Sequence, residues 1–289
     1  MSRTLRSCCE ASTSGITLPG KFWKVESGYV SICLSISESV LGIKYGLLFS
    51  KVTVEDAKCV QTNAYVKAEI FQEYHLKPGG EDEEENISFS VNLGTVLECL
   101  NMFGGTGVEG GAAGSPNLKM CYAGYGHPLV LLLEEQGVVS DCKIRTREAE
   151  PCLDFNFAAA NIVSKVIMKS EYLKDVFTEL DTLSEMVELR VSPTEKTFRV
   201  ATQSPAGESE ATVPDSSDMV EHFSSSATSQ AKYKLGMIRH GLKPLSMSDR
   251  VSLRMDDRDF LCLQYILNTE TGAVFIEFYC APDEDEPER

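Results

Sequence analysis

The pattern of hydrophobic and polar positions is most regular in residues 86–104, NISFSVNLGTVLECLNMFG. Ile87, Phe89 and Val91 alternate with polar residues, which predicts a strand with one buried face. Asn92 can cap a helix, and the glycine pair after residue 103 can end it. The apolar residues between them recur at helical spacing: Leu93, Val96, Leu97, Leu100 and Phe103. This stretch therefore predicts a strand followed by one amphipathic helix that lies on a sheet.

The same order of elements is predicted twice along the chain. Residues 51–74 have the β-branched and aromatic content of two or three strands, and three more strands follow the helix, at 118–122, 128–133 and 138–144. The second half predicts a helix at 158–180 with a break near residues 170–171, strand–helix at 233–244, and a loop at 204–230 with one edge strand at 210–213. Its other predicted strands are residues 153–157, 186–191, 197–203, 251–255, 260–267 and 273–279. The repeat, at about half the chain length, predicts two similar domains of α+β class.

Composition limits the class of protein. The 289 residues suffice for one large or two ordinary domains, and 43% hydrophobic with 24% charged residues is typical of a soluble globular protein. The net charge of −16 argues against a protein that coats nucleic acid with its whole surface, although it permits a local basic strip. The ten cysteines are scattered, which favours a reducing, intracellular compartment. No signal peptide or membrane anchor is predicted, so no membrane partner is expected.

No catalytic, cofactor or metal site is predicted. The four histidines lie outside metal-binding motifs, and the glycine-rich stretch at 104–116 lacks the Lys-Ser/Thr of a phosphate loop. Acidic residues cluster in a loop at 81–85 and in the tail at 283–288, where nothing rigid would hold a metal ion. The pair Asp256-Asp257, next to Arg258, predicts a hairpin turn. A lone Cys or Ser nucleophile remains an open alternative.

Basic residues are concentrated in two segments of the second half. Residues 231–254 contain six Lys or Arg against the single acid Asp249, and residues 158–174 contain Lys165, Lys169 and Lys174 against Glu171. An ordinary solvated helix face would explain either segment alone. Together, in an acidic chain, they predict a strip that follows phosphates without reading bases.

Several long strings together resemble one family. They are KVTVEDAKCVQTNAYVKAEIFQEY, the VNL helix, MCYAGYGHPLVLLLEEQGVVSDCKI, the LDFNF segment and FIEFYCAPDEDEPE. They are similar to the Rad-one subunit of the heterotrimeric DNA-damage checkpoint clamp, the nine-one-one complex, a relative of proliferating cell nuclear antigen. The resemblance covers roughly residues 51–288. It implies a sliding-clamp fold with two similar domains, sheets outside and helices lining a hole that encircles DNA.

The resemblance also implies sites, partners and a domain plan. DNA-facing residues would be Lys165, Lys169, Arg239 and Lys243, on helices at 158–170 and 236–244. Ring closure would use edge strands at 128–135 and 210–213, with interface residues Leu129, Val130, Leu131, Leu132, Leu133, Glu210, Ala211, Thr212 and Val213. The implied plan is clamp domain one at 51–147, connector and first strand at 148–157, clamp domain two at 158–281 and an acidic tail at 282–289. Partners would be two paralogous subunits, a clamp loader, duplex DNA without sequence specificity, and checkpoint and repair proteins in the nucleus, with no cofactor.

Residues 1–50 depart from the family pattern, which begins with a strand and a hole-lining helix. We therefore treat them as a divergent N-terminal segment and transfer no site to them. Two other functions are weighed against the clamp subunit. A 3′–5′ exonuclease, proposed within this family, would need fixed carboxylates that hold Mg²⁺. A homotrimeric replication clamp would assemble without paralogous partners.

Overall fold

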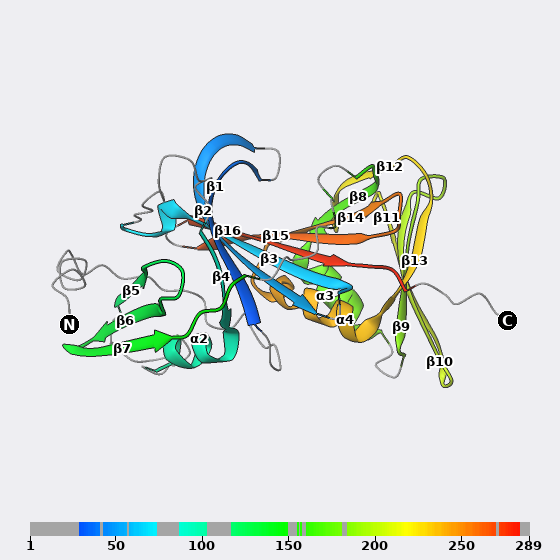
Figure 1. The fold of residues 1–289 in the computed structure, drawn as a ribbon. Coiled ribbons are helices and arrows are strands. Elements are labelled where there is room, and N and C mark those ends of the chain that lie inside the picture. The colour runs from blue at the N-terminus through cyan, green and yellow to red at the C-terminus, as the bar shows by residue number, and fades with distance from the viewer. Residues whose placement is uncertain are drawn as a thin grey trace. The chain divides into compact units, whose positions relative to one another are not determined.

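The computed structural model describes residues 29–40, 43–56, 58–73, 87–102, 117–149, 155, 157, 160–180, 184–269 and 272–283. The chain divides into two compact units, residues 1–50 with 67–150 and residues 51–66 with 151–289. The acidic loop at 81–85, the glycine-rich stretch at 104–116 and nearly all of the acidic tail lie outside the described residues. Figure 1 shows a chain built mainly of strands, with few helices.

The first unit has the predicted order of a strand, a helix and three strands. The side chain of Asn92 accepts a hydrogen bond from the Thr95 backbone N–H at 2.9 Å, which confirms the predicted N-cap. The helix ends at Leu100, three residues before the predicted end. The elements of the first unit are β1 (Tyr29–Val40), paired with β4 (Ile87–Asn92), helix α2 (Leu93–Leu100), and a sheet of three strands, β5 (Asn117–Tyr122), β6 (Leu129–Glu135) and β7 (Val138–Ile144). Strand β2 (Ile43–Asp56) passes from this unit into the second.

The core of the first unit lies between β4, α2 and the three-stranded sheet. Leu129, Leu131 and Leu133 are each 1% exposed and pack with Phe89 and Val91 of β4. The side chains between them, at positions 130 and 132, point to the opposite face and are half-buried. The leucine run thus alternates between a buried face and a half-buried face of the sheet.

The prediction that residues 128–135 form an edge strand is wrong. Strand β6 pairs with β5 on one side and with β7 on the other, so its backbone groups are already hydrogen-bonded within this chain. The inward leucines belong to the core of their own unit. Among the described strands of this sheet, β7 pairs only with β6.

Leu131→Ala should therefore destabilise the fold itself. We expect it to lower the free energy of unfolding by about 3 kcal/mol, because a buried Leu→Ala change costs roughly 2–5 kcal/mol. Leu132→Ala, on the half-buried face of the same strand, should cost less than about 1 kcal/mol. Urea denaturation of both variants measures the difference. Equal destabilisation by the two substitutions would contradict the assignment of the two faces.

The second unit contains two antiparallel sheets and two helices. One sheet has the order β12-β8-β14-β15-β16-β3 and the other the order β11-β10-β9-β13. The strands are β3 (Val60–Lys67), β8 (Ile162–Lys169), β9 (Met186–Ser192), β10 (Thr197–Ser204), β11 (Gly207–Pro214), β12 (Val220–Ser225), β13 (Ser229–Lys234), β14 (Arg250–Asp256), β15 (Leu261–Thr269) and β16 (Gly272–Cys280). Its helices are α3 (Ser170–Glu179), α4 (Leu235–Gly241) and the short 3-10 helix η3 (Lys243–Ser246). The 3-10 helix η1 (Ala68–Ile70), which follows β3, belongs to the first unit.

Two predictions for the second unit need correction. Residues 162–169 form strand β8, not the first half of a helix, because they pair with β14 on one side and β12 on the other. The helix begins at Ser170, where the sequence had suggested a break. The predicted loop at 204–230 contains two strands, β11 and β12. Its edge strand was correctly placed, since β11 pairs only with β10 among the described strands.

The internal repeat predicted from the sequence is visible in the topology. The order β4-α2-β5-β6-β7 in the first unit matches β13-α4-β14-β15-β16 in the second. The pairing agrees as well, because β4 pairs with β1 as β13 pairs with β9. By this correspondence β3 is the counterpart of β11, and β16 is the counterpart of β7.

Candidate nucleic-acid interface

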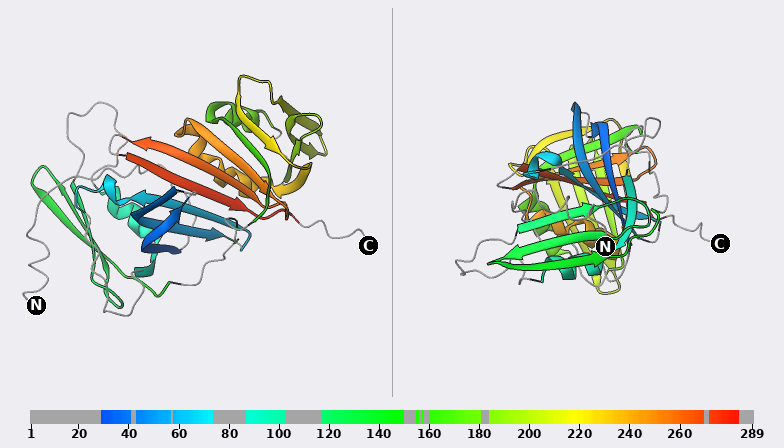
Figure 2. Two further views of the ribbon diagram at one scale, coloured as in Figure 1. Left: turned by 90° about the horizontal axis from the view of Figure 1, so that it is seen from above. Right: turned by 60° about the vertical axis from the view of Figure 1, so that its left-hand side comes forward.

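A layer of helices covers one face of the larger sheet in the second unit. Helices α3 and α4 both contact η3, and they pack on β8 and β16 respectively (Figure 2). The sheet residues beneath them are apolar and fully buried, including Val166, Leu253 and Phe278. Two buried hydrogen bonds hold the layer: Ser170 Oγ lies 2.7 Å from Ser248 Oγ, and Tyr265 donates to the Gly241 carbonyl at 2.7 Å.

Helices α4 and η3 present two of the predicted DNA-facing residues, Arg239 and Lys243, on the solvent side of this layer. Leu235, Ile238 and Gly241 form its buried side, while Arg239 is exposed. Lys243 at the start of η3 is also exposed, and its Nζ lies 3.5 Å from His240 Nδ1. Arg239 and Lys243 therefore lie on the same exposed part of the layer. Their contact with DNA stays a prediction.

Gly241 sets how closely α4 approaches the sheet. A Cβ atom at this position would lie 2.5–2.6 Å from the ring of Phe278, which is itself 1% exposed. No such contact exists at Gly236 in the first turn of the same helix, where a Cβ would meet nothing within 4 Å. Only the glycine at the end of the helix is required by packing.

Gly241→Ala should lower the free energy of unfolding by about 1–3 kcal/mol, because overpacking a buried contact displaces either the ring or the helix. Gly236→Ala should instead stabilise the protein by up to about 1 kcal/mol through helix propensity. Thermal and urea denaturation of the two variants provide the measurement. A neutral Gly241→Ala variant would show that α4 is not held this closely.

The other two predicted DNA-facing residues lie elsewhere. Lys165 lies on β8 between the buried Ser164 and Val166, so its side chain leaves the sheet on the face away from the helices. Lys169 is the N-cap residue of α3, and its Nζ lies 5.6 Å from the centre of the Tyr172 ring. The prediction that Lys165 and Lys169 lie on a helix was wrong because residues 162–169 form a strand.

The exposed side of α3 is more acidic than basic. Glu171, Asp175 and Glu179 are exposed there, against Lys174 alone. In the first unit, α2 has no Lys or Arg, as the sequence indicated. The basic part of the helical layer is therefore α4 with η3.

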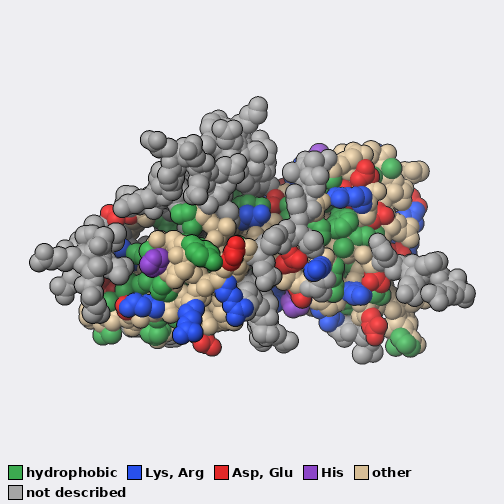
Figure 3. All heavy atoms as spheres, viewed as in Figure 1, with side chains coloured by type: hydrophobic (Ala, Val, Ile, Leu, Met, Phe, Trp, Pro, Cys, Tyr) green, Lys and Arg blue, Asp and Glu red, His purple; other side chains and the backbone are tan. Residues whose placement is uncertain are grey.

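A further basic row was not recognised from the sequence. Lys143, Arg145 and Arg147 are exposed and alternate with inward-pointing residues along β7 and the segment that follows. Two backbone hydrogen bonds between Ser90 and Arg147, both 2.9 Å, hold this segment beside β4. Figure 3 shows Lys and Arg side chains side by side along the margin of the first unit. In the string KIRTR, residues 143–147, every second residue is basic, and this strand-like alternation was the signal that could have identified the row.

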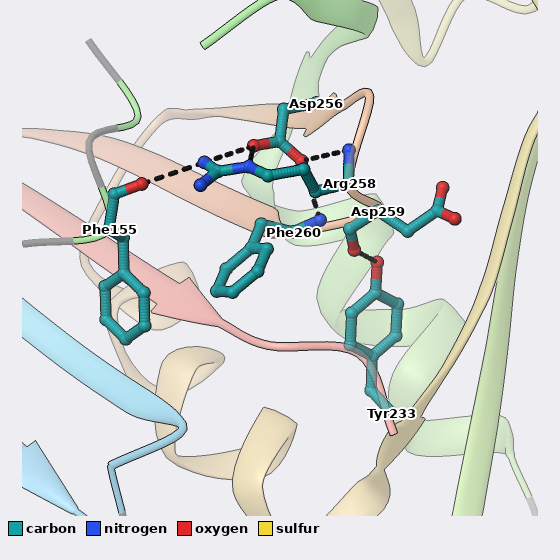
Figure 4. A network of polar contacts seen from close by, with 6 residues as sticks. All are labelled: Phe155, Tyr233, Asp256, Arg258, Asp259 and Phe260. Atoms are coloured by element: carbon teal, nitrogen blue, oxygen red, sulfur yellow. Dashed lines mark hydrogen bonds and ion pairs between the residues drawn. The ribbon is translucent and has the colours of Figure 1, made fainter. Parts of the chain in front are cut away.

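Asp256 and Asp257 lie at the hairpin turn that the sequence predicted. The carboxylate of Asp256, which is 1% exposed, accepts hydrogen bonds from the backbone N–H groups of Arg258 and Phe260 at 3.0 and 2.9 Å. The Arg258 guanidinium donates to the same carboxylate at 2.7 Å and to the Phe155 carbonyl at 2.8 Å (Figure 4). Tyr233 donates to the Asp259 carbonyl at 2.7 Å. This network fastens the turn to the segment that precedes β8.

Two alternatives from the sequence concern catalysis: a metal-dependent exonuclease, which needs metal ligands, and a lone nucleophile such as a reactive cysteine. Among the described residues, no three His, Cys, Asp or Glu side chains are grouped so that they could hold a metal ion. Burial raises the pKa of the Cys59 thiol, and it raises the pKa of Cys99 to about 11 and that of Cys280 to about 12. Nucleophilic cysteines react as thiolates and therefore have lowered pKa values, whereas the pKa values of these three thiols are raised.

Comparison with known proteins identifies the family. The family model described as "Repair protein Rad1/Rec1/Rad17" matches residues 44–267. The cell cycle checkpoint protein RAD1 of Mus musculus is 45% identical over 239 residues, which covers 82% of each chain. The corresponding protein of Homo sapiens is 44% identical with the same coverage. The chain belongs to the Rad1 family.

Two further similarities concern the fold and the chemistry. The crystal structure of PCNA from Thermococcus kodakaraensis matches with a TM-score of 0.62 at 13% identity, over 88% of this chain and 90% of that one. The predicted family and the predicted clamp fold are thus confirmed. A protein named DNA repair exonuclease REC1, from Mycosarcoma maydis, is 23% identical and covers 64% of this chain and 59% of its own length. No helix in the described part of the chain is long and apolar enough to span a membrane.

Proposed function

We propose that the protein is a subunit of a ring-shaped checkpoint clamp that encircles duplex DNA without reading its sequence and serves checkpoint and repair proteins in the nucleus. Membership of the Rad1 family, together with the clamp fold, supports this function. The observation that carries the DNA side of the proposal is the pair of exposed cations Arg239 and Lys243 on the helical layer of an otherwise acidic chain.

The proposed DNA contact is electrostatic. Arg239 is held by α4 and Lys243 by η3, and both short helices have buried residues on their other side, so the two cations are fixed in position while they remain exposed. Contacts of this kind neutralise phosphates and release counterions, which gives affinity without base specificity. The acidic residues on the exposed side of α3 would repel the DNA phosphates. This repulsion would limit DNA contact to α4 and η3, so that the ring could slide along the duplex.

Reversing the two charges should weaken retention on DNA. We expect Arg239→Glu with Lys243→Glu to shorten the lifetime of the assembled clamp on circular duplex DNA. The salt dependence of binding should also fall, by about 0.9 in log–log slope for each phosphate that the variant no longer neutralises. Lys119→Glu with Lys196→Glu is the matched control, because it makes the same charge change on β5 and at the turn between β9 and β10, outside α4 and η3. Equal retention of both double variants at moderate salt would contradict the proposed DNA side.

Ring closure is proposed through β7 and β11. Within the second unit, β16 and β3 pair antiparallel, from Val274 opposite Val66 to Cys280 opposite Val60. Their counterparts in the repeat, β7 and β11, each have a single partner among the described strands. Repeating the same pairing between chains would satisfy both edges in a head-to-tail contact, the kind that closes into a ring.

The exposed side chains fit this assignment. Val138 and Val139 at the start of β7 are 59% and 63% exposed, and a strand paired along β7 would cover part of this apolar surface. The outward positions of β11 include Glu208 and Glu210, of which Glu210 pairs with Arg199 at 3.1 Å, whereas β7 contributes Lys143, which pairs with Asp141 at 2.9 Å, with Arg145 just beyond it. We propose two paralogous subunits as the neighbours on the two edges and a clamp loader that opens the ring. The predicted interface residues Glu210, Ala211, Thr212 and Val213 are kept in this proposal, and β7 replaces the leucine run.

The domain boundaries expected from the resemblance are part of this proposal. Strands β1–β3 correspond to β9–β11, so the first clamp domain would include residues 51–66, although these residues pack within the second compact unit. Domain one would extend from residue 51 to 147 and, by the same correspondence, would also take β1 and the first part of β2 from the divergent segment 1–50. The connector and first strand would be 148–157, domain two 158–281 and the tail 282–289.

Charged residues at the β7 edge should block assembly without unfolding the chain. We expect Val138→Glu with Val139→Glu to weaken co-assembly with the two paralogous subunits at least about tenfold, because burying unpaired carboxylates is unfavourable. The melting temperature should change little, since both side chains are already exposed. Tyr125→Glu, at a residue 82% exposed in the same unit, is the control. Size-exclusion chromatography with light scattering measures both, and unaffected assembly of the valine variant would refute the edge assignment.

An exonuclease is kept as a second candidate because the fungal relative carries that name. Its test is degradation of labelled duplex DNA by the purified chain, with Mg²⁺ and with EDTA. Mg²⁺-dependent removal of nucleotides that persists through purification, and that substitution of particular acids abolishes, would establish an enzyme. Absence of degradation would leave the clamp as the function.

A further inference from the structure

Four basic residues face one another across two neighbouring strands of the second unit. In the antiparallel register of β8 and β14, Lys165 lies directly opposite Arg254, and Lys169 lies directly opposite Arg250. The pair between them in the same face is Ile167 with Ser252. These residues come from the two basic segments of the sequence. The fold brings them together on a sheet instead of on two helices.

The pair Lys165 and Arg254 lies on the face of the sheet that the helices do not cover. Its neighbours on β8 and β14, at positions 164, 166, 253 and 255, are all buried and point to the opposite face of the sheet. Lys165 and Arg254 themselves are half-buried, so their stems are held by the sheet while their charged ends reach solvent. The site is therefore separate from Arg239 and Lys243, which leave the opposite side of the unit.

The acids around this pair are engaged with other groups. Glu221 on β12 binds Arg250 at 2.8 Å, and Asp256 binds Arg258. Glu277 accepts hydrogen bonds from Tyr65, Tyr279 and Gln264 at 2.7–3.0 Å. Within the described part of the chain, no carboxylate lies within ion-pair distance of Lys165 or Arg254. The polar contact of Arg254 is a long one, from Nε to Ser252 Oγ at 3.4 Å.

Like charges directly opposite each other on adjacent strands destabilise a sheet. An anion placed between Lys165 and Arg254 would remove this repulsion and supply the missing partner to both. Ser252 beside Arg254, and Ser224 opposite Lys165 on β12, add hydroxyl groups that can donate to the same anion.

We propose that Lys165 and Arg254 form a docking site for an acidic segment of a partner protein. Lys169, whose Nζ lies 5.6 Å from the centre of the Tyr172 ring, and Arg250, which also binds Glu221 at 2.8 Å, are the next cations along the two strands and extend the site. Four residues of extended chain separate the two basic pairs, which is about 13 Å at roughly 3.3 Å per residue. A peptide in extended conformation places residues i and i+4 at this same spacing. The partner segment is thus one with acidic residues four positions apart, bound on the face away from the encircled DNA.

The binding test uses two fluorescein-labelled ten-residue peptides in Gly/Ser sequence, one with Glu at positions 3 and 7 and one with Gln there. Fluorescence anisotropy with the full chain should detect the Glu peptide at low salt and at least about tenfold weaker binding of the Gln peptide. Lys165→Gln with Arg254→Gln should abolish the preference. Lys174→Gln with Lys196→Gln, which removes the same charge elsewhere on the unit, should leave it intact. Equal affinity of both double variants would overturn the site.

A stability measurement distinguishes a specific site from general charge attraction. Lys165→Gln should raise the melting temperature in anion-poor buffer, because it relieves the repulsion from Arg254. The Glu peptide should raise the melting temperature of the wild-type chain and leave that of the variant unchanged. If the variant melts at a lower temperature, the pair is not repulsive and the proposal fails. If the double variant loses binding to duplex DNA while the peptide binds both proteins equally, the patch is a nucleic-acid surface and the proposal fails as well.

Discussion

An antiparallel sheet leaves unpaired N–H and C=O groups along any strand that has a neighbour on only one side. This constraint organises the whole protein. In the second unit, β16 would be such an edge, and β3 from an earlier part of the chain satisfies it along its length. The repeat leaves β7 and β11 with the same requirement and no described partner for it. A ring of several subunits is the arrangement that satisfies both without adding a new kind of contact, because it reuses a pairing that the chain already makes with itself.

The position of the helices follows from the same sheet. Alternation along β8, β14 and β16 places apolar side chains on one face, and α3, α4 and η3 cover that face. Gly241 brings α4 close enough for Tyr265 to donate to its backbone, so Arg239 on α4 and Lys243 on the adjoining η3 are held by tightly packed elements. The residues that we assign to DNA are thus placed by contacts on the opposite side of their own helix.

The sequence predicted the elements whose signals are local. The hairpin between β6 and β7 has Gln136 and Gly137 at φ 50° and 82°, the conformation that Gly and polar residues favour in two-residue turns, and the strands on either side were correctly predicted. Strand β8 was mistaken for helix because Ile162, Val163, Val166 and Ile167 satisfy a helical period as well as a strand period. What decides the matter is pairing with β12 and β14, which lie over 50 residues away in sequence and leave no local signal. For the same reason the sequence could not tell that β6 is central and β7 is the edge.

The error over β8 also changes the meaning of the basic residues. On a helix, Lys165 and Lys169 would share one side with a spacing of four residues, and they would join Arg239 and Lys243 on the DNA side. On a strand, the same spacing of four also keeps them on one face, but there Lys165 lies opposite Arg254 and Lys169 lies opposite Arg250. Lys165 and Arg254 leave the sheet on the face that the helices do not cover. One unit of an acidic protein therefore presents positive charge in two directions. A ring subunit has use for both, because one side meets the DNA that passes through it and the other meets the proteins that the ring recruits.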